Sequence, residues 1–177
     1  MSRLMLCGLM SWLTLSSTTP VRADEAEDKV VAFVKDLKGS VTRDESLPGK
    51  PVIEVNLNGS EVTDAGAKEL AKLTKLTTLG LKGTKLTDAG MKELAKLTKL
   101  TTLNLGGTKV GDAGAKELAK LTNLFFLQLS DTQVGDKGAK ELAKLTKLTF
   151  LGLNETKVSE TGLKELQKAL PNCKIMK

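Results

Sequence analysis

Histidine and tyrosine are absent from this chain of 177 residues, tryptophan occurs once, and aromatic residues make up only 3% of the sequence. Without histidine, the chain cannot form the Ser-His or Cys-His pairs that activate a nucleophile in many hydrolases. A structural zinc site needs several Cys or His ligands, and the chain has only two cysteines. We therefore predict that the protein is not an enzyme and that it holds no metal and no cofactor.

A hydrophobic run long enough to cross a bilayer is also missing. The apolar run 4–15 follows Arg3 and is too short to span a membrane. Val21-Arg22-Ala23 then offers the small residues that a signal peptidase reads. The pattern predicts a signal peptide over residues 1–23, cleaved before Asp24, with an uncleaved anchor as the alternative. We expect an exported protein, periplasmic, cell-surface or secreted, that keeps no stable membrane span.

Cleavage would leave Cys173 as the only cysteine, so the mature chain could form no internal disulfide. Cys173 lies in an apolar terminal stretch, which favours a buried structural thiol. Loss of Arg3 and Arg22, with no acidic residue in the same segment, lowers the formal net charge from +6 to +4. Such a charge is low for a protein that binds polyanions. We predict no nucleic-acid binding.

The chain is rich in one feature, an internal repeat of 24 residues. The unit that begins at Val62 recurs from Leu86, Val110 and Val134, and a partial copy begins at Val158. Apolar residues alternate at positions 79 and 81, which predicts a short strand. The apolar residues at 67, 70, 71 and 73 fall on one stripe of a helix. Each unit therefore combines one strand with one helix.

The pattern Leu76-x-x-Leu79-x-Leu81-x-x-Thr84 resembles the leucine-rich repeat. Thr84 replaces the usual Asn or Cys, as in the ribonuclease-inhibitor-like and cysteine-containing subclasses. The phrase Val-Thr-Asp-Ala-Gly is similar to that of secreted bacterial leucine-rich-repeat proteins, and the repeats also resemble those of F-box proteins. The resemblance covers residues 52–177. It implies a right-handed α/β solenoid with a parallel sheet on the concave face, helices on the convex face, five strand-bearing repeats and a terminal half-copy.

Residues 24–51 are predicted to form an N-terminal cap, because a stack of repeats needs its open end covered. Four apolar residues lie on one face of a helix that Gly39 would end: Val30, Phe33, Val34 and Leu37. Pro48-Gly49 predicts a turn. The cap is expected to consist of one helix and this turn.

Three further columns have expected structural roles. The acidic column at 64, 88, 112, 136 and 160 lies at the helix starts, where carboxylates cap free amides. The glycine column at 66, 90, 114, 138 and 162 costs helix propensity, so close packing is the expected reason. The threonine ladder at 84, 108, 132 and 156 is expected to bond the backbone of adjacent loops. Lys68 and its copies lie beside Glu69 and its copies, which is typical of a solvated helical face.

The copies differ mainly in the strand and the turn after it, at positions that alternate with the core leucines. A variable surface on a constant scaffold favours recognition, although unconstrained drift is the alternative. The candidate binding residues are Thr78, Thr102, Phe126 and Phe150 at the first position, Asn104 and Gln128 at the second, and Lys82, Ser130 and Asn154 at the third. Phe126 and Phe150 should lie about 5 Å apart. Phe125 is expected to tuck against the edge of the solenoid.

We predict a monomeric scaffold that binds a protein partner, whose identity the sequence does not give, through the concave face. Two alternatives remain. One is a substrate-recognition subunit like the F-box receptors, against which the absence of room for an F-box and the predicted signal peptide both argue. The other is a structural component of the cell surface.

Overall fold

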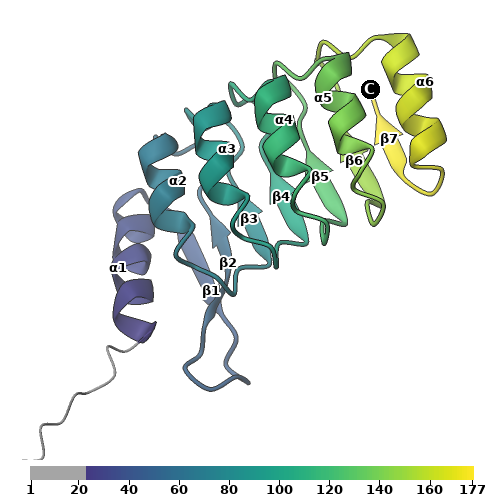
Figure 1. The fold of residues 1–177 in the computed structure, drawn as a ribbon. Coiled ribbons are helices and arrows are strands. Elements are labelled where there is room, and N and C mark those ends of the chain that lie inside the picture. Colours follow the sequence, from purple (N-terminus) through teal and green to yellow (C-terminus); the bar gives the residue numbers. More distant parts are fainter. Residues whose placement is uncertain (1–22) are drawn as a thin grey trace, which may run out of the picture.

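Strand and helix alternate along the chain from Val52 to Met176, and the units stack side by side (Figure 1). The computed structural model describes residues 23–177. The expected signal peptide, residues 1–23, lies outside this part apart from Ala23, the first residue of helix α1. Within residues 23–177, no helix is both long and apolar enough to span a membrane.

One seven-stranded sheet follows the order of the sequence. Its strands are β1 (Ser40–Arg43), β2 (Val52–Asn56), β3 (Thr78–Gly80), β4 (Thr102–Asn104), β5 (Phe126–Gln128), β6 (Phe150–Gly152) and β7 (Lys174–Met176). Five helices lie between consecutive strands from β2 onward: α2 (Asp64–Leu70), α3 (Asp88–Leu94), α4 (Asp112–Leu118), α5 (Asp136–Leu142) and α6 (Glu160–Ala169). Strands β2 to β7 are parallel, and these helices line one face of the sheet. The predicted α/β solenoid is confirmed.

The 24-residue spacing places equivalent leucines on neighbouring strands. Leu79 pairs with Leu103, Leu103 with Leu127, and Leu127 with Leu151, and all four are completely buried. Ala67, Leu70 and Leu73 in the helical half of the unit are completely buried as well. Burial of one leucine side chain contributes about 1.5–3 kcal/mol. The core is therefore a continuous stack of aliphatic layers, one layer for each repeat.

The acidic column joins consecutive repeats, and the expectation that each residue caps its own helix was wrong. Asp64 in α2 accepts hydrogen bonds from the amides of Thr87 and Gly90, at 2.9 and 3.0 Å, at the start of α3. Asp112 does the same for Gly135 and Gly138. The carboxylates therefore satisfy helix N-terminal amides in the next repeat.

This contact also explains the glycine column. A Cβ atom on Gly114 would lie 2.5 Å from the Oδ1 atom of Asp88. Only glycine leaves room for the carboxylate of the preceding repeat. In the first unit, where no repeat precedes, the ring of Phe33 from α1 lies 3.0 Å from the Cβ position of Gly66. Close packing was predicted correctly, and the carboxylate as its cause was not.

The threonine ladder stabilises each repeat from within. The hydroxyl of Thr84 donates to the carbonyl of Leu81, three residues earlier, at 2.8 Å. Thr108, Thr132 and Thr156 make the same bond. The expected bonds to adjacent loops are not formed, because each hydroxyl turns back to the end of its own strand.

Helix α1 (Ala23–Asp36) and strand β1 cover the first repeat (Figure 1). Val30 and Val34 are completely buried. The helix ends earlier than expected: Lys38 takes the left-handed conformation with φ 59°, and the amide of Gly39 donates to the carbonyl of Val34 at 2.9 Å. Strand β1 was not predicted. It pairs antiparallel with β2 and supplies one edge of the sheet.

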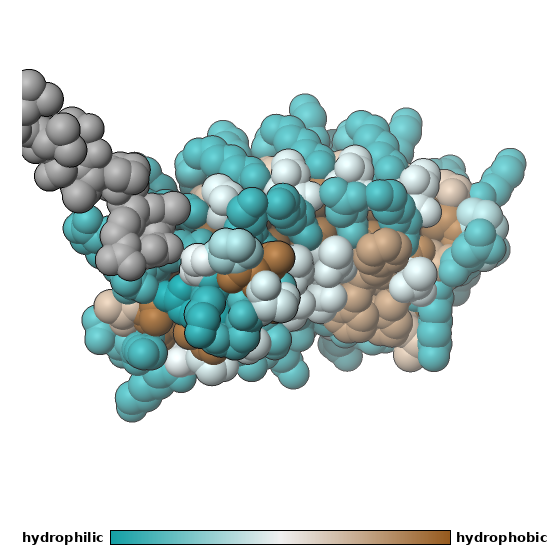
Figure 2. Space-filling model, turned by 90° about the horizontal axis from the view of Figure 1, so that it is seen from below, coloured by the Kyte–Doolittle hydropathy of each residue, from teal (hydrophilic) through white to brown (hydrophobic). Residues whose placement is uncertain are grey.

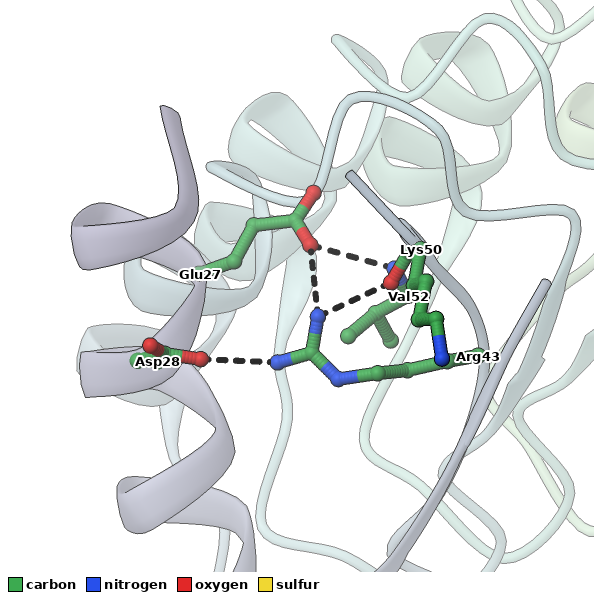
Figure 3. Close-up of polar contacts among 5 residues, drawn as sticks. All are labelled: Glu27, Asp28, Arg43, Lys50 and Val52. Carbon is green, nitrogen blue, oxygen red and sulfur yellow. Dashed lines mark hydrogen bonds and ion pairs between the residues drawn. The ribbon is translucent and has the colours of Figure 1, made fainter. Parts of the chain in front are cut away.

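Arg43 joins α1 to the β1–β2 hairpin (Figure 3). Its guanidinium donates to Asp28 Oδ1 at 2.8 Å, to the carbonyl of Lys50 at 2.9 Å, and to Glu27 Oε2 at 3.5 Å. Glu27 also accepts the amide of Val52 at 3.1 Å. One arginine therefore fixes both the helix and the loop that leads into the first strand of the parallel sheet.

The C-terminal copy contributes a helix and a strand, so it is more than the expected half-copy. Helix α6 continues to Ala169 and is longer than the helices before it. Strand β7 nevertheless keeps the 24-residue register, since Ile175 pairs with Leu151. Cys173 lies just before β7 and is buried, 4% exposed.

Candidate binding surface on the open face of the sheet

The helices leave one face of the sheet uncovered, and we call it the open face. Strand residues that alternate with the core leucines project from it. Direct strand pairing aligns six of them in what we call the first column: Glu54, Thr78, Thr102, Phe126, Phe150 and Lys174. The first and last are exposed, and the four between them are half-buried. The structure therefore brings the four first-position candidates into one line.

Phe126 and Phe150 stack on each other at the centre of this surface. Their ring centroids are 4.6 Å apart and the rings are tilted by only 6°. The expected separation of about 5 Å is confirmed. Thr78 and Thr102 occupy the same register position on β3 and β4, so the aromatic rings are confined to β5 and β6.

Apolar surface gathers on the half of the solenoid away from the N-terminal residues. Figure 2 shows a tan patch there, bordered by near-white surface. Side chains that this half leaves at least partly exposed include Phe125, Phe126 and Phe150. Phe125 is 47% exposed, so the expectation that it tucks against the edge was wrong. At its position Thr77, Thr101 and Thr149 each bond the carbonyl one repeat earlier, and a phenylalanine has no hydroxyl to do so.

The second column alternates between amides and glycines: Asn56, Gly80, Asn104, Gln128 and Gly152. Asn104 accepts the amide of Gly106 at 3.1 Å, and Gln128 accepts the amide and the hydroxyl of Ser130 at 3.1 and 2.8 Å. A Cβ atom on Gly152 would collide with the amide group of Gln128. These amides are therefore already bonded to the turn that follows their own strands.

Two shallow hollows lie on this surface. The first, about 170 Å³, is lined by Glu54, Thr78, Thr102, Asn104 and Phe126, among others. The second, about 350 Å³, is lined by Lys82, Asn104, Gln128, Ser130 and Asp131 and by two glycines. The third-position candidates Lys82 and Ser130 thus border the second hollow. Asn154 lies beside them, with its amide 3.4 Å from the hydroxyl of Ser130.

The turn that follows each strand needs one residue with positive φ. Gly59, Gly83 and Gly107 have φ values of 72°, 69° and 69° in the first three turns. Asp131 and Glu155 adopt φ values of 55° and 59° in the next two. Residues with a Cβ atom are strained in this conformation. The carboxylates of these two residues are exposed at the border of the open face.

Charges on the helical side are largely paired. Lys96 donates to Glu93 at 2.6 Å, and the same pair recurs in the three other full repeats. The hydrogen bond from Lys96 lowers the pKa of Glu93 below its ordinary value. Such exposed pairs add little stability, but they leave a balanced outer surface.

The described residues offer little for chemistry. Burial raises the pKa of the Cys173 thiol, which keeps it in the unreactive thiol form. No group of three or more acidic, cysteine or histidine side chains within residues 23–177 is arranged to hold a metal ion. The open face is therefore best described as a recognition surface built on rigid strands.

The repeats match the family model described as leucine-rich repeat in four consecutive units, residues 51–71, 72–95, 96–119 and 120–143, which together exceed half of the chain. The chain belongs to the leucine-rich-repeat family. Members of this family generally serve as scaffolds that bind proteins. No curated protein sequence matches the chain.

Several solved structures share the fold. A leucine-rich-repeat protein of Leptospira interrogans is 31% identical, with a TM-score of 0.50 over 60% of this chain and 26% of that protein. The chain therefore spans about a quarter of the Leptospira protein. A plant ice-binding protein is 19% identical, with a TM-score of 0.55 over 77% of this chain and 48% of its own. The leucine-rich-repeat ectodomain of the Arabidopsis thaliana receptor kinase SOBIR1 is 14% identical, with a TM-score of 0.54 over 85% and 90%.

Sequence reasoning missed the two charged ends of the first column. Glu54 lies in the degenerate first copy, where its alignment with Thr78 was not considered. Lys174 follows Pro171-Asn172, where one residue is inserted and the register of the last strand was not assigned. Counting 24 residues back from Lys174 to Phe150 would have found this position.

Proposed function

We propose that this domain is an exported scaffold that binds a protein partner through the open face of its sheet. The observation that carries the proposal is the stacked pair Phe126–Phe150, half-exposed on the face that no helix covers. Aromatic side chains at the centre of a surface are typical anchors of protein interfaces. Thr78 and Thr102 occupy the same column, so the repeat itself does not require an aromatic residue there.

The test replaces both rings with the residue that the earlier repeats use, as Phe126→Thr with Phe150→Thr. Partners are captured on the purified protein, identified by mass spectrometry, and their affinity is then measured. Removal of central aromatic anchors typically costs 2 kcal/mol or more, so affinity should fall about thirtyfold or more. Lys92→Ala on the outer helix is the control and should leave binding unchanged.

Thermal unfolding of the same variants separates binding from folding. The double variant should melt close to the unmodified protein, because both side chains are half-exposed. Unchanged binding would place the recognition surface elsewhere. A large loss of stability would instead assign the two rings a role in folding.

Export is part of the proposal, and it rests on the apolar run 4–15 followed by Val21-Arg22-Ala23. N-terminal sequencing of the protein from its native host should begin at Asp24 or within a residue or two. Recovery of an intact form starting at Met1 in the cytoplasm would contradict it.

A further inference from the structure

The first column carries opposite charges at its two ends. Glu54 on β2 and Lys174 on β7 are both exposed and occupy the register positions that the candidate residues fill on the strands between them. Among residues 23–177, neither side chain forms an ion pair. The open face therefore has an acidic end, a threonine section, an aromatic section and a basic end.

Strand spacing converts this order into distances. Neighbouring strands lie ~4.8 Å apart, so five spacings separate the backbones of Glu54 and Lys174 by ~24 Å. Phe126 lies three spacings, or ~14 Å, from Glu54, and Phe150 lies one spacing, or ~5 Å, from Lys174. The column is thus asymmetric, with the apolar anchor close to the basic end.

The space between the acidic end and the aromatic pair is open. Glu54 and Phe126 line the same hollow of about 170 Å³, together with Thr78, Thr102 and Gly80. Gly80 has no side chain, and the neighbouring threonines are short. A ligand that lies across the strands would meet no bulky side chain between Glu54 and Phe126.

We propose that the ligand of the open face is an extended peptide segment with a basic residue, an apolar residue four positions away, and an acidic residue two positions beyond that. An extended chain advances ~3.3 Å per residue, so four residues cover ~13 Å and six cover ~20 Å. Residues an even number apart project from the same side of such a chain. The basic side chain then faces Glu54, the apolar one contacts the Phe126–Phe150 pair, and the acidic one faces Lys174. This inference rests on the proposed function and specifies the chemistry of the partner.

The test selects seven-residue peptides from a random display library on three forms of the full protein. These are the unmodified protein, the charge-reversed variant Glu54→Lys with Lys174→Glu, and the ring variant Phe126→Thr with Phe150→Thr. The charged residues are exposed, so their reversal should leave folding intact, and thermal unfolding checks this. The unmodified protein should enrich peptides with the basic–apolar–acidic spacing, read in one chain direction. The charge-reversed variant should enrich the opposite charge order around the same apolar residue.

Synthetic peptides then give the magnitude. A selected peptide should bind the charge-reversed variant about two- to fivefold more weakly for each reversed charge. The peptide with its own two charges exchanged should recover that loss. The loss should also shrink at high salt, because exposed ion pairs are screened.

The outcomes separate this inference from the proposed function. If both the unmodified and charge-reversed proteins enrich the same charge order, or no common sequence, the charge-ordered peptide is ruled out. Loss of enrichment on the ring variant would still support recognition through the aromatic pair. If the ring variant enriches the same peptides as the unmodified protein, the open-face site itself is excluded.

Discussion

The Oδ1 atom of Asp112 accepts the amide hydrogen of Gly138 at 2.9 Å and lies 2.7 Å from the point where a Cβ atom on that glycine would stand. The glycine thus serves both as a donor and as the space in which the carboxylate lies. Because the same geometry recurs between neighbouring helices, each repeat positions the next one through its backbone.

Gly138→Ala should therefore destabilise the protein, although alanine is the better helix former. The added methyl group would also lie 2.9 Å from Val134 and 3.0 Å from Ala115, so the two helices would have to separate. We expect a loss of about 1–3 kcal/mol in the free energy of unfolding, measured by chemical denaturation. The control is Gly135→Thr, whose Cβ atom has no neighbour within 3.5 Å and whose hydroxyl copies that of Thr87. If both substitutions have the same effect, the carboxylate is not the cause.

The core register can be tested at Leu103, which is completely buried between Leu79 and Leu127. Leu103→Ala should lower the free energy of unfolding by about 2–5 kcal/mol, because the neighbouring repeats cannot close the cavity. Lys92→Ala on the exposed side of α3 should cost less than about 0.5 kcal/mol. Similar losses in chemical denaturation would contradict the assigned register.

Asp131 and Glu155 offer sites where a substitution should stabilise the fold. Both hold positive φ values at the turn position that glycine fills in the first three turns. Asp131→Gly and Glu155→Gly should each raise the free energy of unfolding by about 0.5–1 kcal/mol, since release of strain outweighs the greater freedom of the unfolded glycine. The reciprocal change Gly107→Ala should lower it. A decrease for both glycine substitutions would mean that these acidic side chains have stabilising contacts of their own.

Acid should weaken the junction between the last two repeats. Asp136 accepts hydrogen bonds from the amide and hydroxyl of Ser159 at 2.7 and 2.8 Å, and these bonds lower the pKa of its carboxyl. A carboxyl whose pKa is lower in the folded state stabilises the protein above its unfolded pKa, about 4, and loses this contribution as the pH falls through the folded value. The melting temperature of the unmodified protein should therefore drop more between pH 7 and pH 3 than that of Asp136→Asn. Equal drops would show that this carboxyl does not couple to folding.

The fold was predictable because its periodicity is written directly in the sequence. Leucines 24 residues apart must meet on neighbouring strands, and the helical stripe between them has one face to bury. The stacking of Phe126 on Phe150 followed from the same count. Elements outside the repeat were harder: β1 has no apolar alternation strong enough to distinguish it from a loop, and its pairing depends on contacts with β2 and α1.

Hydrogen-bond partners were less predictable than positions. The sequence places Asp64 at a helix start, but it cannot distinguish the amides of its own helix from those of the next, which lie 23 to 26 residues away. The open-face amides pose the same problem, because Asn104 and Gln128 vary as a recognition surface would and yet bond their own turns. Such choices depend on distances of a few ångströms between stacked units.

The two edges of the sheet differ in what they allow. At the N-terminal edge, the antiparallel strand β1 ends the parallel order, and Arg43 fixes it to α1. At the other edge, β7 keeps the register that every earlier strand uses. A duplicated unit could therefore be added only after β7 without rebuilding a junction. Each addition would widen the sheet by ~4.8 Å and move its final strand that much farther from Glu54, so the reach of this scaffold could be adjusted by gene duplication at a single end.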